Sequence, residues 1–223
     1  MRHAKRLVIT AGFTGITLFG ATQTQAAAYQ FSCIPDPASS VANCNTATTQ
    51  IQMDVASVSA NQVSFTFSNT GSQASSIEGV YFDDGTLLGI SYLVDKDENG
   101  GLAGVDFTGG SASPGNLPRG ANLLPEFEVT AGFLADADAP VAKNGVNPDE
   151  WLTVVFDLQS GGTYNDVIAE LADGRLRVGL HVIAFESGDS ESLVNQMTPV
   201  PLPSALLFML SGLAGLLGLR RKN

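Results

Sequence analysis

The residues best suited to chemistry are the oxygen-bearing side chains of one short acidic segment. Asp95, Asp97 and Asn99 alternate along it, Gly100 follows, and Asp106 is the twelfth residue counted from Asp95. Oxygen donors at the first, third, fifth and twelfth positions, with glycine at the sixth, are typical of a calcium-binding loop. The spacing therefore predicts a calcium site formed by Asp95, Asp97, Asn99 and Asp106, with an affinity in about the millimolar range of extracellular modules.

Two features separate this segment from an EF-hand. Asp106 replaces the longer bidentate glutamate, and the flanking residues 90–94 and 105–108 have the composition of strands rather than helices. A solvated acidic turn between two strands would contain the same residues. The spacing alone leaves both interpretations open.

Candidate catalytic groups are few. His181 is the single histidine between Tyr29 and Thr198, on a strand expected over residues 175–185. A zinc site of three histidines is therefore excluded, and a serine triad would have to use this one imidazole. The chain also has no Gly-x-Ser-x-Gly motif and no glycine-rich phosphate loop. We expect His181 to be a structural or surface residue and the protein not to be an enzyme.

Paired carboxylates are the remaining candidates for catalysis. They are Asp83 with Asp84, Asp136 with Asp138, and Asp149 with Glu150. Two carboxylates that face each other across a cleft would support glycoside hydrolysis. A carboxylate-dependent hydrolase is therefore an alternative, although acidic pairs of this kind are most often solvated turn residues.

The elements that would position these groups are mainly strands. Apolar and polar residues alternate over 51–55 and again over 63–67, with a turn at 59–61, which predicts a β-hairpin. Further strands are expected at 80–82, 87–94, 151–158 and 176–182. Glycine and proline separate these segments, so the sequence predicts an all-β fold, a sandwich of antiparallel strands.

One short helix is expected, at residues 165–172. Thr163 can cap its start and Gly174 can end it, while Val167, Ile168 and Leu171 fall on one face. Residues 107–146 have little periodicity, and we interpret them as long loops with one short strand at 127–130. A binding site is expected among such loops.

The two cysteines, Cys33 and Cys44, lie close to the start of the predicted domain. In an oxidising compartment they are expected to form a disulfide around the intervening loop, which is rich in proline, asparagine and serine. The chain-entropy model gives such a bond about 3 kcal/mol of stabilisation. A redox-active pair would need the Cys-x-x-Cys spacing, which is absent.

The N-terminus has the three regions of a secretory signal peptide. Basic residues (Arg2, Lys5 and Arg6) precede an apolar stretch at 7–20, and small residues follow at Ala26, Ala27 and Ala28. We predict a signal peptide of residues 1–28, cut by signal peptidase after Ala28. Cleavage after Ala26, or no cleavage and retention as an anchor, are the alternatives.

The C-terminal segment, residues 199–223, has the organisation of a membrane-targeting signal. It begins with a proline motif, Val200, Pro201, Leu202 and Pro203, continues with an apolar run at 205–219, and ends with a basic cluster, Arg220, Arg221 and Lys222. Basic residues remain on the cytoplasmic side of a membrane, so residues 29–198 are expected on the opposite side. A helix over 205–219 would be about 22 Å long, which is short for a hydrocarbon core of about 30 Å and suits a transient anchor. A plain single-pass anchor is the alternative.

This tail resembles the PEP-CTERM sorting domain of exosortase-dependent surface proteins in Gram-negative bacteria. Leu202 is found where the commonest motif of that family has glutamate. The resemblance implies that a membrane-embedded exosortase cuts near the motif and passes the protein to the cell surface or the exopolysaccharide matrix. Residues 79–85, 113–118, 144–148, 179–182 and 190–195 also look like segments of a group of such proteins, for which the resemblance implies no particular activity.

The net charge of the residues between the two terminal signals limits the kinds of molecule that they can bind. Six of the 11 basic residues lie in the two terminal signals, whereas all 22 acidic residues lie between them, which leaves the exported part with a net charge of −17. Such a field repels phosphate backbones, so nucleic acid is excluded as a partner, and it attracts cations. The sequence therefore predicts an exported surface or matrix protein with a structural or adhesive role. The alternative is a module that uses calcium to bind exopolysaccharide.

Overall fold

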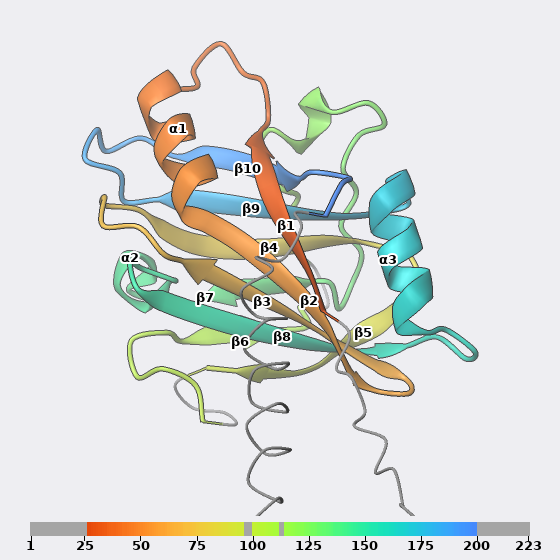
Figure 1. Cartoon of the computed structure of the whole chain (residues 1–223). Helices are drawn as coiled ribbons and strands as arrows, with labels where there is room; N and C mark the ends of the chain where they lie inside the picture. Colours follow the sequence, from red (N-terminus) through yellow and green to blue (C-terminus); the bar gives the residue numbers. More distant parts are fainter. Residues whose placement is uncertain (1–25, 96–99, 112–113, 200–223) are drawn as a thin grey trace, which may run out of the picture.

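The computed structural model describes residues 26–95, 100–111 and 114–199. Its core is a ten-stranded sheet in which every strand pairing is antiparallel (Figure 1). The strands are β1 (Ala26–Cys33), β2 (Ile51–Ser59), β3 (Gln62–Asn69), β4 (Ser76–Asp84), β5 (Leu87–Val94), β6 (Phe107–Gly109), β7 (Leu134–Ala137), β8 (Glu150–Leu158), β9 (Leu176–Ile183) and β10 (Glu191–Asn195). The all-β expectation is confirmed.

The sheet order is β5-β8-β3-β2-β1-β10-β9-β4-β7-β6. Strand β1 belongs to both halves, because Ala26–Gln30 pair with β2 whereas Phe31–Cys33 pair with β10. The end strands approach each other, since Gly109 on β6 lies against Ile90 and Leu93 on β5. The two halves therefore face each other as in a sandwich, but they form one nearly closed sheet.

Aromatic rings fill the space between the two halves. Phe82 on β4 lies 4.5 Å from Phe156 on β8 and 5.2 Å from Phe65 on β3, measured between ring centroids, and both contacts are edge-to-face. All three side chains are fully buried. Edge-to-face pairs contribute beyond the area they bury, so this cluster joins β4 in one half to β3 and β8 in the other.

The predicted hairpin is confirmed as β2 and β3. Ile51 is opposite Asn69 and Val55 is opposite Phe65, with alternate residues buried on both strands. The strands predicted at 80–82, 87–94, 151–158 and 176–182 correspond to β4, β5, β8 and β9. The turn between β4 and β5 connects the two halves of the sheet, because β4 pairs with β9 and β5 pairs with β8.

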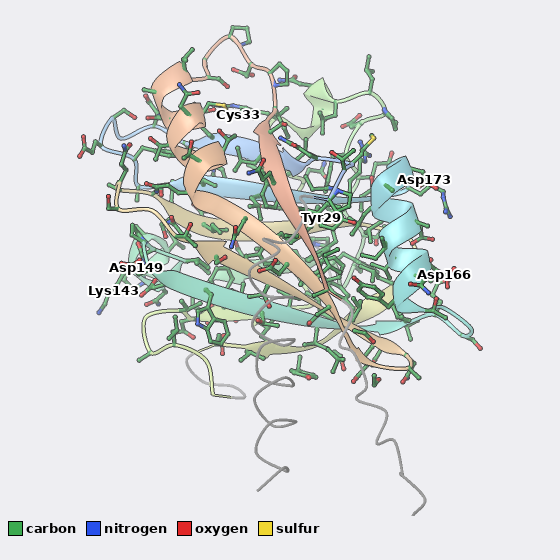
Figure 2. All side chains as sticks on the ribbon, in the orientation of Figure 1. Tyr29, Cys33, Lys143, Asp149, Asp166 and Asp173 are labelled. Atoms are coloured by element: carbon green, nitrogen blue, oxygen red, sulfur yellow. A yellow bond between two sulfur atoms is a disulfide. The ribbon has the colours of Figure 1, made fainter. Side chains whose placement is uncertain are left out.

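The predicted helix is confirmed as α3 (Tyr164–Asp173). The Thr163 side chain accepts a hydrogen bond from the Asp166 backbone, Asp166 bonds back to Thr163, and Gly174 ends the helix with φ of 77°. This is a capping box at one end and a left-handed glycine at the other. Asp166 and Asp173 mark its two ends in Figure 2.

The expectation of one helix is wrong. A second helix, α1 (Val41–Gln50), follows the loop after Cys33, and two short helical segments, α2 (Val141–Asn144) and η1 (Gly120–Asn122), lie among the loops. The buried residues of α1 are Asn43, Ala47 and Gln50. Because two of these three are polar, the helix lacks the apolar periodicity by which a buried face is recognised in a sequence.

The strand predicted at residues 127–130 is also wrong. This segment is among the described residues and contains no strand, whereas β6 and β7 lie in the region predicted to be loops. Strands β1 and β10 were not predicted. The first three residues of β1 are small and resemble a signal-peptidase site, and three buried residues of β10, Glu191, Ser192 and Asn195, are polar.

The described part of the chain contains no helix with the length and apolarity needed to cross a membrane. The predicted membrane helix at 205–219, the sorting motif and the basic cluster lie outside the described residues. The apolar stretch of the predicted signal peptide, residues 7–20, lies outside them as well.

Candidate functional site

The predicted disulfide is present. Cys33, at the end of β1 (Figure 2), is bonded to Cys44 on α1, and their Cα atoms are 5.9 Å apart. The bond attaches the first turn of the helix to the strand that both halves of the sheet share. It therefore helps to hold α1 against the sheet, together with hydrogen bonds from Ser40, Asn43 and Gln50.

Removing this bond should lower stability measurably. For the double variant Cys33→Ser with Cys44→Ser, we expect the free energy of unfolding to fall by about 3 kcal/mol, because the unfolded chain regains loop entropy. Urea unfolding of both forms checks this. A reducing agent should destabilise the native protein and leave the double variant unaffected, and equal midpoints for both proteins would contradict the prediction.

The acidic segment predicted to bind calcium is only partly described. Asp97 and Asn99 lie outside the described residues. The Asp95 side chain is 2% exposed, and its Oδ2 accepts a hydrogen bond of 2.9 Å from the backbone N–H of Phe107. Asp106 is also buried. Asp95 thus connects the end of β5 to the start of β6.

Calcium binding stays a prediction for this segment. Among the described residues, no group of three or more histidine, cysteine or acidic residues could hold a metal ion. If Asp97 and Asn99 complete a site with Asp95 and Asp106, calorimetry should show heat on adding calcium and a melting temperature that falls on adding chelator. The absence of both effects would contradict the prediction.

The acidic pairs take part in local structure. Asp83 forms an ion pair with Arg177, and Asp138 accepts hydrogen bonds from the Thr108 hydroxyl at 3.1 and 3.2 Å. Glu150 accepts a bond of 2.8 Å from the backbone of Asn147. In each acidic pair, at least one carboxylate therefore has a structural role in holding a turn or a strand.

His181 lies on the outer face of the sheet, on β9, with its side chain 17% exposed. Its Nδ1 is 3.6 Å from a carboxylate oxygen of Glu78 on β4. Burial lowers the pKa of His181 below its ordinary value of 6.5, and the nearby Arg119 acts in the same direction, whereas Glu78 and Asp136 act to raise it. Burial, Asp136 and Glu78 also raise the pKa of the neighbouring Tyr81 to about 12.

We therefore expect His181 to be neutral at pH 7 and to titrate below 6.5. The unfolded chain then binds this proton more tightly, so the His181 contribution to stability should be lost as the pH falls below about 6.5. Titration of the imidazole signal by NMR checks the pKa, with a His181→Gln variant to assign the signal. A midpoint at or above 6.5 would mean that Glu78 outweighs burial.

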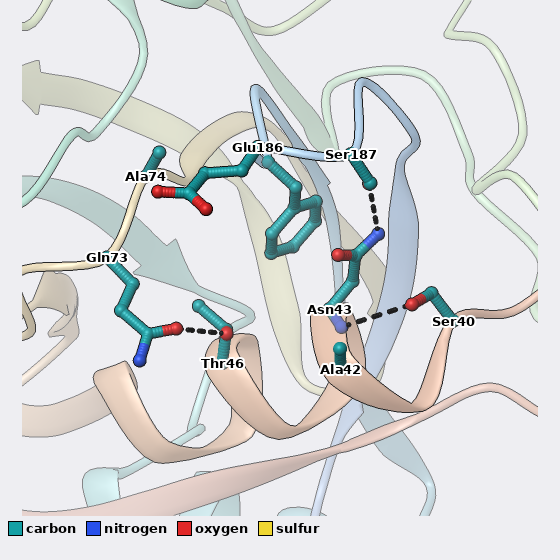
Figure 3. Close-up of a pocket in the computed structure, with 9 residues that line it drawn as sticks. Ser40, Ala42, Asn43, Thr46, Gln73, Ala74, Glu186 and Ser187 are labelled. Carbon is teal, nitrogen blue, oxygen red and sulfur yellow. Dashed lines mark hydrogen bonds between the residues drawn. The ribbon is translucent and has the colours of Figure 1, made fainter.

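A hollow of about 520 Å³, lined by both polar and apolar atoms, lies between α1, the β3–β4 loop and the β9–β10 loop (Figure 3). We call it the α1 groove. The residues important to its chemistry are Asn43, Thr46, Gln73, Phe185, Glu186 and Ser187. Pockets of about 300–1,000 Å³ are typical of small-ligand sites.

Hydrogen bonds connect the walls of the α1 groove. Asn43 Nδ2 donates to Ser187 Oγ at 2.9 Å, which joins α1 to the β9–β10 loop. The Thr46 hydroxyl donates to Gln73 Oε1 at 2.7 Å, which joins α1 to the β3–β4 loop. Both bonds are drawn in Figure 3. The groove is thus defined by contacts between segments far apart in the sequence.

Gln50, the last residue of α1, holds the β3–β4 loop in place. Its Nε2 donates to the Gln73 carbonyl at 3.0 Å, and its Oε1 accepts from the Gln73 backbone N–H at 2.8 Å. The loop passes so close to this side chain that a Cβ on Gly71 would lie 2.0 Å from Gln50 Cδ. A side chain at position 71 would therefore displace the Gln50 amide from its hydrogen bonds to Gln73.

Sequence reasoning did not identify the α1 groove. Its residues are ordinary polar side chains from one helix and two loops, without a motif or a shared spacing. The only local signal is Ser40, whose side chain accepts a hydrogen bond from the Asn43 backbone as an N-cap.

Comparisons with protein-family models, with curated proteins and with solved structures found no match. The class of the protein therefore follows from its own features. It is a disulfide-bonded, all-β domain with a groove between one helix and two loops.

Proposed function

We propose that the protein is an exported surface or extracellular-matrix component with a structural or adhesive role and no catalytic activity. The observation that carries the proposal is the Cys33–Cys44 disulfide. Structural disulfides form and persist in oxidising compartments and are rare in the cytosol. The net charge of −17 between the terminal signals repels nucleic acid, which agrees with a role at the cell surface or in the matrix.

The position of the last strand supports C-terminal processing. β10 ends at Asn195, and the proline motif begins at Val200. A cut by an exosortase-type protease near this motif would leave every described strand in the product. The apolar run and the basic cluster would then serve as a temporary anchor that holds the chain in the inner membrane until it is cut.

The pairing of strand β1 distinguishes between the two candidate signal-peptidase sites. Ala27 and Ala28 pair with Val55 and Asp54 of β2. Cleavage after Ala28 would remove these pairs, whereas cleavage after Ala26 would keep them. We therefore propose that signal peptidase cuts after Ala26 and that the mature chain begins at Ala27.

The experiment is the intact mass and the terminal residues of the protein recovered from cells with and without a functional sorting protease. We expect Ala27 at the N-terminus in both strains and a shortened C-terminus only where the protease works. An uncut tail in both strains would leave a plain membrane anchor. Full-length protein dissolved in the cytosol would contradict export itself.

A further inference from the structure

The α1 groove has hydrogen-bonding groups that the protein does not use. Among the described residues, Glu186 makes no hydrogen bond, and Gln73 uses its side-chain oxygen but not its Nε2. Asn43 likewise uses its Nδ2 and leaves its Oδ1. The groove therefore offers a carboxylate and an amide oxygen as acceptors, and an amide nitrogen as donor.

One end of the groove rests on the hydrophobic core. Phe185 lines the groove next to the exposed Glu186, but it is 5% exposed and packs in the main core cluster. It therefore anchors the chain segment that carries Glu186. In this it differs from residues 187–189 of the β9–β10 loop, which are polar or glycine and exposed.

The walls of the groove are fixed before any ligand arrives. The disulfide at Cys44 and the N-cap at Ser40 hold α1, and the buried amide of Gln50 holds the β3–β4 loop. Ser40 is itself held, because its backbone N–H donates to the fully buried Glu191 at 2.6 Å. A rigid groove binds a ligand with a smaller entropic cost than a mobile one.

The chemistry of the groove selects one class of ligand. Glu186 and the strongly negative domain repel anions. An apolar ligand would leave the carboxylate and the amides unpaired and desolvated. Sugar hydroxyls both donate and accept, so they match all three groups.

We propose that the α1 groove binds a neutral sugar unit of a polysaccharide, with Glu186 and Gln73 bonding to its hydroxyls. This inference adds a ligand to the proposed surface role, and it rests on that role for the place where the polysaccharide is met. The acidic segment at Asp95 is not part of the groove.

The test uses the full chain, purified in detergent with its disulfide intact. Calorimetry is done with three neutral probes, maltotetraose, cellotetraose and mannotetraose, and with one anionic probe, tetragalacturonate. We expect heat of binding with at least one neutral probe and none with tetragalacturonate. No binding of any neutral probe, or binding of the anionic probe alone, would overturn the proposal.

Variants locate the binding. Glu186→Gln should weaken binding about tenfold, because it replaces a charge-assisted hydrogen bond to the ligand with a neutral one. Gln73→Ala should weaken binding about tenfold, because it removes a hydrogen bond. Glu128→Gln is the matched control, since Glu128 is an exposed carboxylate that does not line the groove. Equal affinity of Glu186→Gln and Glu128→Gln would overturn the assignment. The melting temperature of each variant verifies that it is folded.

The two proposals fail in different ways. Binding is measured on purified protein, so it does not depend on where the cell sends the chain. A protein that is exported and trimmed but binds no neutral probe would lose only the groove assignment. A protein that binds a neutral probe but stays in the cytosol would lose only the export proposal.

Discussion

Phe82→Ala is expected to lower the free energy of unfolding by about 3–5 kcal/mol, the range for removing a buried aromatic side chain. Phe82 is fully buried and contacts Phe65, Phe67 and Phe156 at centroid distances of 5.2, 6.1 and 4.5 Å. These partners belong to β3 and β8, in the half of the sheet opposite β4. The substitution would therefore open a cavity where the two halves meet.

Urea or thermal unfolding of the wild type and the variant measures this loss. Leu88→Ala is the control, because Leu88 is 64% exposed and its truncation should change stability by less than about 0.5 kcal/mol. A loss below about 1 kcal/mol for Phe82→Ala would show that the aromatic cluster is not the joint between the halves. A very large loss would leave no folded protein, and Phe82→Leu would then give the smaller, measurable effect.

Arg119→Met is expected to cost about 3–5 kcal/mol, because it leaves a buried carboxylate without its charge partner. Arg119 Nη1 lies 2.5 Å from Glu191 Oε2, and the Glu191 side chain is fully buried. The guanidinium also donates to the Ser39 hydroxyl at 3.1 Å and to the Ser190 carbonyl at 3.2 Å. Arg119 thus attaches the loop before η1 to both β10 and the segment before α1.

The control is Lys143→Met, because Lys143 is exposed and forms no ion pair within the described part of the chain. It should change stability by no more than about 0.5 kcal/mol. A double variant, Arg119→Met with Glu191→Met, should recover part of the loss, because it removes the uncompensated charge. If Arg119→Met and Lys143→Met are equally stable, the buried pair has no special role.

Charged and apolar contacts also explain why residues 127–130 are not a strand. Phe127 is 1% exposed, in a second apolar cluster with Ile34, Tyr81, Leu117 and Leu134 on the outer face of the sheet. The Arg177 guanidinium lies over its ring, 5.2 Å from the centroid. The apolar residue that suggested a strand is instead the attachment point of a long loop. Its sequence alone could not distinguish these two uses.

Two glycines on the sheet allow this loop to lie close. A Cβ on Gly179 would lie 2.4 Å from Leu117, and a Cβ on Gly79 would lie 2.9 Å from the ring of Tyr81. Side chains at these positions would push the loop and the tyrosine away from the sheet. Gly179 on β9 therefore makes room for a residue from outside the strand, whereas Gly79 makes room for the ring of Tyr81 on its own strand β4.

Local patterns were sufficient wherever neighbours in sequence are neighbours in space. The β2–β3 hairpin has alternating burial and a short turn, α3 has its capping box and terminal glycine, and two cysteines admit a single pairing. The all-β class follows from the same patterns. Each of these features depends on residues at most 18 positions apart, so the sequence by itself determined them.

Only the tertiary structure decided how distant segments meet. β1 pairs with β10 from the other end of the domain, and this pairing joins the two halves of the sheet. The same meeting places Asn43 beside Ser187 and Gln50 beside Gln73, which forms the α1 groove. These polar side chains follow no periodic pattern in the sequence. The hydrogen-bond partner of each one depends on how the whole chain packs. The groove therefore exists only when the fold is complete.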